Sequence, residues 1–162
     1  MTKTGSLELK DALSNCFIDN QKKLYLTALA ITKNHQLAED ALQESYLKTV
    51  KKYHQLKDVA FAKTWITRIV INECKNMLKS NKTIATDFQE FEMQYVEDFN
   101  DEELRFYSMI GNLTLEDKEI MTLKYFQGYT LDEIALILNM PLSTVKSRVY
   151  RALEKLKAEW RD

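Results

Sequence analysis

The chain has 162 residues, of which 45% are apolar, enough to build the core of one medium domain or two small ones. Its formal net charge of −1 excludes a uniformly basic or uniformly acidic protein. No apolar run approaches the roughly 18 residues of a membrane span, and the first residues lack the apolar centre of a signal peptide. We therefore expect a cytoplasmic protein with no segment inserted in a membrane.

Turn-forming residues are scarce and charge is unevenly distributed along the chain. With 3 Gly and 1 Pro, the sequence favours long helices and an all-α fold. Residues 1–82 hold 14 basic and 8 acidic side chains, residues 83–112 hold 1 basic and 8 acidic, and residues 113–162 hold 8 of each. This asymmetry indicates binding to a polyanion more clearly than the net charge does.

The first strongly patterned helix is predicted over residues 37–53. One face carries apolar and small side chains and is expected to face the core. These residues are Ala38, Ala41, Leu42, Ser45, Tyr46, Thr49 and Tyr53. Asp40, Gln43 and Glu44 share the other face, with Leu47 among them. A leucine on a polar face favours a protein partner there, although a solvated charged cluster explains the polar residues equally well.

A second amphipathic helix is predicted over residues 61–82. Its core stripe consists of Ala62, Trp65, Ile66, Ile69, Val70 and Met77. The opposite face carries Thr64, Arg68, Asn72, Lys75 and Lys79, bordered by Asn76, with Trp65 at its edge. Cations can grip the phosphates of a nucleic-acid strand while amides read exposed base edges. A plain solvated basic face is the alternative.

Residues 83–104 contain no basic side chain and form the clearest domain boundary. Phe88, Phe91, Tyr95 and Phe99 lie among their carboxylates. Three interpretations remain open for this linker: a flexible tether, an acidic segment that occupies a basic channel, or a partly helical segment.

Residues 130–153 have the pattern of a helix-turn-helix. Thr130 and Glu133 predict a capping box, Asn139 tolerates the left-handed conformation that ends a helix, and Pro141 suits the first turn of the next helix. Ile134, Ala135 and Leu138 are expected to face inward in the first helix. In the second helix the expected core residues are Leu142, Val145, Val149, Ala152, Leu153 and Leu156. Upstream, residues 114–128 predict a capped supporting helix with Ile120, Met121 and Leu123 inward.

The outward face of the second helix carries hydroxyl and basic side chains. They are Ser143, Thr144, Ser147, Tyr150 and Arg151, flanked by Lys146, Arg148 and Lys155. Short hydroxyls and long guanidinium groups at the start of a recognition helix can reach base edges and phosphates in the major groove. This face predicts contact with DNA more strongly than a solvated surface, which usually mixes both charge signs.

Catalytic and metal-binding patterns are missing from the sequence. Cys16 and Cys74 have neither CxxC spacing nor a nearby histidine pair, which predicts buried thiols in a reducing compartment. His35 and His54 are the only histidines, and no DxD, HxH or paired carboxylate beside a lysine occurs. We expect no metal, no cofactor and no enzymatic activity, so a nucleic-acid enzyme is the weakest candidate.

Three stretches, in order, resemble the extracytoplasmic-function class of bacterial sigma-70 factors, which has only sigma regions two and four. AEDALQESYLKTVKKY, residues 38–53, resembles the region-two helix that binds the β′ clamp helices of RNA polymerase. FAKTWITRIVINECKNMLKSNK, residues 61–82, resembles the helix that melts the promoter and recognises the −10 element. Residues 113–157 resemble region four, which binds the −35 element and the β flap.

The resemblance implies an alternative sigma factor that binds core RNA polymerase, recognises the −35 and −10 elements, and promotes promoter melting and transcription initiation. It implies two small helical domains, region two at residues 1–82 and region four at residues 105–162. The acidic linker, residues 83–104, would then thread the RNA channel of the polymerase. The family also implies an anti-sigma factor, often membrane-anchored, that covers the polymerase-binding faces.

Together with the patterns above, the resemblance predicts three sets of site residues. Core polymerase is expected to bind Asp40, Gln43, Glu44 and Leu47. The −10 DNA is expected to bind Trp65, Arg68, Asn72, Lys75, Asn76 and Lys79. The −35 DNA is expected to bind Ser143, Thr144, Lys146, Ser147, Arg148 and Arg151. A stand-alone helix-turn-helix repressor would explain only the third set.

Overall fold

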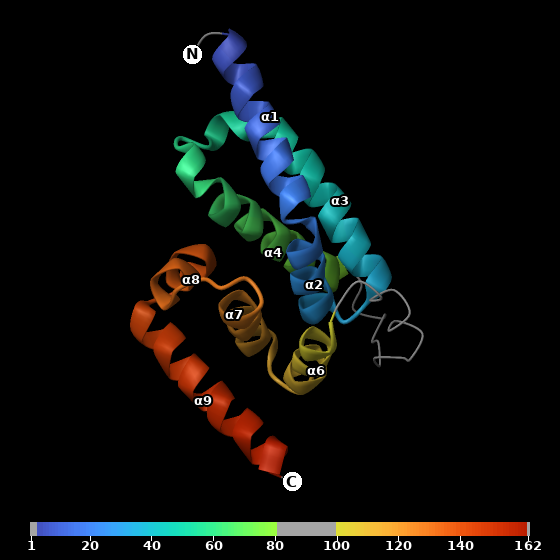
Figure 1. The fold of residues 1–162 in the computed structure, drawn as a ribbon, viewed down its shortest axis with the longest axis vertical. Coiled ribbons are helices and arrows are strands. Elements are labelled where there is room, and N and C mark those ends of the chain that lie inside the picture. The colour runs from blue at the N-terminus through green and yellow to red at the C-terminus, as the bar shows by residue number, and fades with distance from the viewer. Residues whose placement is uncertain (1–2, 81–99, 162) are drawn as a thin grey trace.

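The computed structural model describes residues 3–80 and 100–161, and most of them are helical (Figure 1). Within these two ranges the chain forms eight α-helices and two short 3-10 turns, and no β-strand. The expected all-α fold with two helical units is confirmed. In the same ranges no helix is both long enough and apolar enough to cross a membrane.

Four helices build the N-terminal unit: α1 (Lys3–Asp19), α2 (Gln21–Thr32), α3 (His35–Lys51) and α4 (Ala62–Ser80). Helix α2 is central, since every residue from Leu24 to Thr32 except Tyr25 is buried. Helix α3 begins two residues before its predicted start because the side chain of Asn34 caps it, accepting a hydrogen bond from the backbone N–H of Leu37.

The predicted core faces of α3 and α4 are largely confirmed, but α4 buries a second side as well. Ala62, Ile66 and Val70 are buried as expected, whereas Trp65, Ile69 and Met77 are half-buried. Thr67, Ile71, Glu73 and Cys74 are also buried. Contacts with other elements account for this second side, because Thr67 bonds to Tyr129 and Glu73 pairs with Lys48.

The turns between α3 and α4 are the 3-10 segments η1 (Tyr53–Gln55) and η2 (Val59–Phe61). The side chain of Asp58 accepts a hydrogen bond from the backbone N–H of Ala60 and starts η2. Val59 and Phe61 are more than half exposed. The short connection therefore brings α3 and α4 together as antiparallel neighbours with an apolar turn facing solvent.

The C-terminal unit contains α6 (Asp101–Ile110), α7 (Leu115–Tyr125), α8 (Leu131–Leu138) and α9 (Leu142–Arg161). Helix α6 starts inside the predicted linker, so residues 101–104 form its first turn. Its start is determined by a capping box between Asn100 and Glu103, and three acidic residues in the first turn suit the positive end of the helix dipole. The other predicted linker residues, 83–99, lie outside the described ranges.

The predicted helix-turn-helix is formed by α8 and α9. Thr130 and Glu133 make the expected capping box, and Asn139 ends α8 in the left-handed conformation with φ 53°. Pro141 precedes α9, and its carbonyl accepts the hydrogen bond from the N–H of Val145. The proline therefore lies just before the first turn of α9, where its missing N–H leaves no hydrogen bond unmade.

Removing the Thr130 cap should weaken the C-terminal unit by about 1 kcal/mol, because the first N–H groups of α8 would lose their acceptor. The measurement is the midpoint of urea unfolding for Thr130→Ala. Thr130→Ser keeps the hydroxyl and should stay close to the wild type. Equal midpoints for Thr130→Ala and the wild type would show that the capping box contributes nothing.

The two units pack directly on each other. Helix α7 contacts α2, and α8 contacts α4 (Figure 1). Buried side chains of both units belong to one continuous cluster, including Leu29 and Ile71 from the N-terminal unit and Ile120 and Ile137 from the C-terminal unit. The relative position of the units is thus set by packed surfaces among the described residues.

The two cysteines differ in environment. Cys74 is fully buried in α4, and burial raises the pKa of its thiol to about 12, so it is not reactive at neutral pH. Cys16 is only half-buried, and the expectation of two buried thiols is wrong at this position. Both cysteines are free.

Candidate nucleic-acid and partner interfaces

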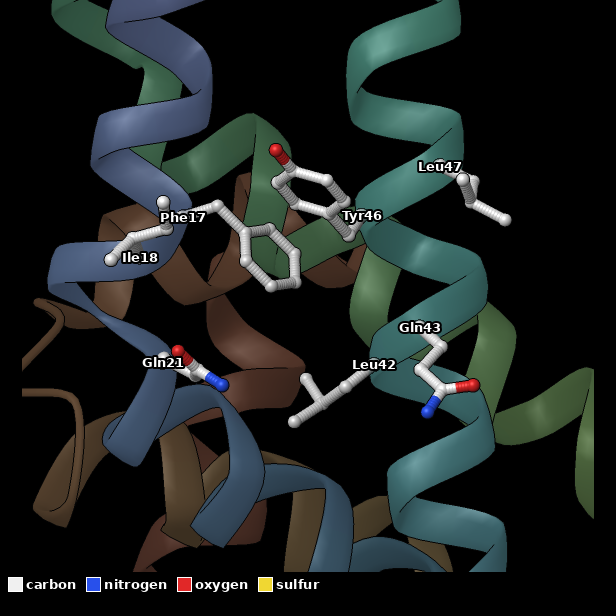
Figure 2. Close-up of a pocket in the computed structure, with 7 residues that line it drawn as sticks. All are labelled: Phe17, Ile18, Gln21, Leu42, Gln43, Tyr46 and Leu47. Carbon is white, nitrogen blue, oxygen red and sulfur yellow. The ribbon is translucent and has the colours of Figure 1, made fainter.

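The first candidate surface is a cleft between α1 and α3 (Figure 2). Its volume is about 480 Å³, and its lining residues are Phe17, Ile18, Gln21, Leu42, Gln43, Tyr46 and Leu47. The rings of Phe17 and Tyr46 meet edge to face with centroids 5.3 Å apart. The Tyr46 hydroxyl also lies 2.8 Å from Ser14 Oγ, which ties α3 to α1.

Two predicted polymerase-binding residues, Gln43 and Leu47, line this cleft. Leu47 is 61% exposed and points away from α1 in Figure 2. Asp40 and Glu44 are half-buried, and Asp40 accepts a hydrogen bond from Gln36. Exposed apolar side chains beside carboxylates and amides are typical of a surface that binds a protein partner, and less typical of one that only faces solvent.

Sequence reasoning missed the contribution of α1 to this cleft. Ile18 is 55% exposed and lies next to the buried Phe17. Adjacent residues of a helix point about 100° apart, so a large apolar residue next to the core position of Phe17 was the available signal for a second apolar face. Their position opposite α3 depends on tertiary packing, which local periodicity does not reveal.

The second candidate surface is the outer face of α4. Arg68, Asn72, Asn76 and Lys79 are exposed, while Trp65 and Lys75 are half-buried. Arg68 Nη2 donates a hydrogen bond to the carbonyl of Leu136 on α8. Lys75 Nζ lies 3.4 Å from Glu119 Oε2 on α7. Two of the three cations predicted to bind the −10 DNA, Arg68 and Lys75, are therefore engaged by the C-terminal unit.

A cleft of about 470 Å³ separates this face from the end of α8. It is lined by Arg68, Ile71, Asn72, Lys75, Ile137, Leu138 and Asn139. The structure thus brings together three of the six predicted −10 residues, Arg68, Asn72 and Lys75. Trp65, Asn76 and Lys79 do not line the cleft.

The third candidate surface is the exposed face of α9. Ser143, Lys146, Ser147, Tyr150 and Arg151 are exposed, and Thr144 is half-buried. The expected core side is confirmed, with Val145, Val149, Ala152 and Leu156 buried and Leu142 and Leu153 half-buried.

Arg148 differs from its neighbours on α9. Its guanidinium lies 2.6 Å from Glu116 Oε2 and 3.3 Å from Asp117 Oδ1, both in the first turn of α7. Only 25% of its side chain is exposed. This predicted DNA-binding residue therefore holds α9 against α7, and its charge is already balanced in the structure.

An apolar groove lies between α6, α7 and α9. Its volume is about 310 Å³, and its lining residues are Phe106, Met109, Met121, Tyr125, Leu153, Leu156 and Lys157. The rings of Phe106 and Phe126 pack edge to face with centroids 4.6 Å apart. The sequence patterns did not predict this groove, because α6 partly overlaps the stretch assigned to the linker.

Two protein-family models match the chain in the order of its two units. The model described as Sigma-70 region 2 matches residues 16–84, and the model described as Sigma-70, region 4 matches residues 103–156. The chain belongs to the sigma-70 family. The first match contains α3 and α4 with their outer faces, and the second contains the helix-turn-helix of this sigma factor.

Curated relatives place this sigma factor in the extracytoplasmic-function (ECF) class. It is 29% identical to RNA polymerase sigma factor SigV of Bacillus subtilis over 154 residues, which cover 93% of this chain and 92% of that protein. It is 27% identical to the ECF RNA polymerase sigma-E factor of Haemophilus influenzae over 135 residues, covering 73% and 71% respectively. The family predicted from the sequence is confirmed.

The fold also resembles that of a solved sigma factor. RpoE of Bartonella quintana, crystallised with the anti-sigma factor NepR, has a TM-score of 0.68 with this structure at 22% identity. The similarity covers 99% of this chain and 98% of the other. It therefore extends over both helical units.

Proposed function

We propose that this ECF sigma factor binds core RNA polymerase, recognises −35 and −10 promoter elements and promotes melting of the promoter, acting in the cytoplasm and catalysing no covalent step. The observation that carries this proposal is that one chain has two separate faces suited to DNA. They follow each other along the chain in the order of sigma regions 2 and 4. These are the basic face of α4 in the region 2 match and the hydroxyl-rich face of α9 in the region 4 match.

Helix α9 is suited to reading duplex DNA at the −35 element. Its exposed side chains include Ser143, Lys146, Ser147 and Arg151. In a major groove, such hydroxyl and basic side chains can contact base edges and phosphates together. Arg148 would support this face indirectly, because it fixes the start of α7 to α9 through Glu116 and Asp117.

Helix α4 is suited to holding the separated −10 strand. Arg68 and Lys75 would bind phosphates, and the amides of Asn72 and Asn76 would hydrogen-bond the edges of unstacked bases. Trp65 and Lys79 flank these residues. Unstacking a base requires a few kcal/mol, so a face that binds only the separated strand shifts the duplex toward the open state.

Core polymerase would dock on two apolar features. We assign the α1–α3 cleft, with Asp40, Gln43, Glu44 and Leu47 at α3, to the β′ clamp helices. The groove between α6, α7 and α9 would take the β flap. Residues 1–82 would act as the first domain, and the acidic linker that begins at residue 83 would join it to a second domain whose first helix, α6, starts at Asp101 and not at the predicted residue 105.

A protein inhibitor is part of the same proposal. The B. quintana relative was solved in complex with an anti-sigma factor. We propose a comparable partner for this chain, bound to the same exposed apolar surfaces that the polymerase would use.

The proposed function is tested by transcription with purified core polymerase on a library of genomic promoter fragments. The expected result is run-off transcripts from a subset of fragments that share −35 and −10 sequences. Tight sequence-specific DNA binding without polymerase, combined with no transcripts on any fragment, would instead favour a repressor.

The role of α9 is tested in that assay by Arg151→Ala, which should lower transcript yield from all active fragments. Binding of the holoenzyme to these fragments should lose about one unit of its logarithmic salt slope, as expected for one phosphate contact. Arg148→Ala should instead lower thermal stability and leave the salt slope nearly unchanged, because the Arg148 charge is balanced by Glu116 and Asp117. The reverse pattern would exchange the roles of the two arginines.

A further inference from the structure

A buried carboxylate lies between the two helices that carry the proposed polymerase and −10 surfaces. Glu73 belongs to α4, which packs against α3, and it is only 5% exposed. Burying a carboxylate is costly unless cations and hydrogen-bond donors compensate it, whereas an apolar side chain of similar size has no such cost. Core packing alone therefore does not explain a glutamate at this position.

A lysine of α3 balances the charge of Glu73. Lys48 Nζ donates a hydrogen bond to Glu73 Oε1, and the Lys48 side chain is 33% exposed. Lys48 directly follows Leu47 and lies one helical turn after Glu44, two residues of the proposed polymerase surface. The ion pair thus joins the helix that would bind polymerase to the helix that would hold the −10 strand.

The same carboxylate oxygen faces a residue that is proposed to contact bases. Asn76 Nδ2 donates a hydrogen bond to Glu73 Oε1, one turn back along α4, at 3.5 Å. The distance is long for a hydrogen bond, so the contact contributes little to stability. It does determine orientation, because a carboxylate only accepts hydrogen bonds and the nitrogen of the amide must therefore face Glu73.

Asn76 stays accessible to a ligand while its amide nitrogen is held. The residue is exposed and does not line the cleft between α4 and the end of α8. With the nitrogen turned to Glu73, the carbonyl oxygen of the planar amide points away from the carboxylate. This oxygen can accept a hydrogen bond from an exocyclic amino group, which adenine and cytosine have and thymine lacks.

We propose that Glu73 is a positioning residue that sets a base preference of the −10 surface. By holding the Asn76 amide with its oxygen outward, Glu73 selects adenine or cytosine over thymine at one position of the separated strand. Lys48 supports this role, because it balances the buried charge from the polymerase-binding helix. The inference rests on the proposed −10 role of α4 and adds to it a residue that does not touch DNA.

An ion pair that only joins α3 to α4 is the other explanation of Lys48 and Glu73. Its loss would destabilise the protein and lower transcription equally at every promoter. A positioning role predicts a different result, a change of base preference that depends on Asn76. Base preference is therefore the readout that separates the two explanations.

The test uses the full-length variant Lys48→Met/Glu73→Leu, which replaces both partners by apolar side chains so that no charge remains buried alone. Holoenzymes with wild-type or variant sigma factor transcribe a template library in which the −10 region of one active promoter is randomised. A barcode in the transcribed region identifies each template by sequencing. We expect the wild type to prefer adenine or cytosine over thymine about tenfold at one position. The double variant should reduce this ratio to about twofold or less, because the amide can then present either end.

Further variants connect the effect to Asn76. Asn76→Ala should abolish the same preference, and adding it to the double variant should change nothing more, because Glu73 acts only through this amide. Asn76→Asp is an exposed substitution that leaves the core intact and offers only acceptors. It should keep the preference for adenine or cytosine while lowering the total yield. Lys51→Met removes an exposed lysine from the next turn of α3 and should leave the preference unchanged.

Two results would overturn the inference. One is a double variant that has the unfolding midpoint of the wild type and keeps its full base preference. The other is loss of the preference in Asn76→Asp, which would mean that the wild-type amide presents its nitrogen, and this result does not depend on the folding of the double variant. An absence of transcripts from every template with the wild type as well would instead contradict the proposed function.

Discussion

Leu47→Asp is expected to lower the affinity of this sigma factor for core polymerase by roughly thirtyfold or more, the effect of losing one buried apolar contact at the centre of an interface. Leu47 is 61% exposed on α3, beside a cleft with aromatic walls. Docking against the polymerase would bury the leucine, whereas an aspartate there would have to lose its hydration. Competition binding against a labelled wild-type sigma factor measures the effect.

The matched control is Leu7→Asp. Leu7 is 62% exposed on α1 but is not among the residues that line the cleft. Its substitution should leave the affinity for polymerase unchanged, and neither variant should alter the unfolding midpoint appreciably. Equal losses of affinity in the two variants would mean a general effect of added negative charge and would remove the assignment of the α1–α3 cleft.

Ile120→Ala is expected to reduce the free energy of unfolding by about 2–5 kcal/mol, because it leaves a cavity in a closely packed core. Ile120 is fully buried in α7, the helix that contacts both α2 and α9. The same substitution should therefore loosen both the support of the helix-turn-helix and the packing between regions 2 and 4. Urea unfolding followed by circular dichroism measures the loss.

Leu136→Ala provides the comparison for Ile120→Ala. Leu136 is 64% exposed on α8, and its contact with Arg68 uses only the backbone carbonyl. Its truncation should change stability by no more than about 0.5 kcal/mol. If Ile120→Ala were equally mild, α7 would not form part of the core that positions region 4.

Local features of the fold followed from the sequence because they depend on neighbouring residues. The capping box of Thr130 and Glu133 and the left-handed Asn139 are interactions within one turn of chain. The buried stripe of α9 follows the helical period, so Val145 and Val149 were predicted correctly. The same local rules explain the predicted faces of α3 and α4.

Features that depend on distant segments were missed. The start of α6 at Asp101 was assigned to the linker, because the assignment followed the absence of basic side chains in residues 83–104 and not the capping box at Asn100. The ion pairs of Arg148 with Glu116 and Asp117 were not predicted, because these two carboxylates come from another helix. The burial of Thr67 likewise results from Tyr129, a residue 62 positions away.

By itself, the sequence determined the helical class, the helix-turn-helix and which faces of α3, α4 and α9 carry polar chemistry, because periodicity and capping are local. Only the tertiary structure decided that α8 contacts α4, where Arg68 bonds to the Leu136 carbonyl, and that Lys75 meets Glu119. The physical reason is that contacts between regions arise from complementary surfaces far apart in the chain. The residue pattern of a single helix does not predict which other helix will pack against it.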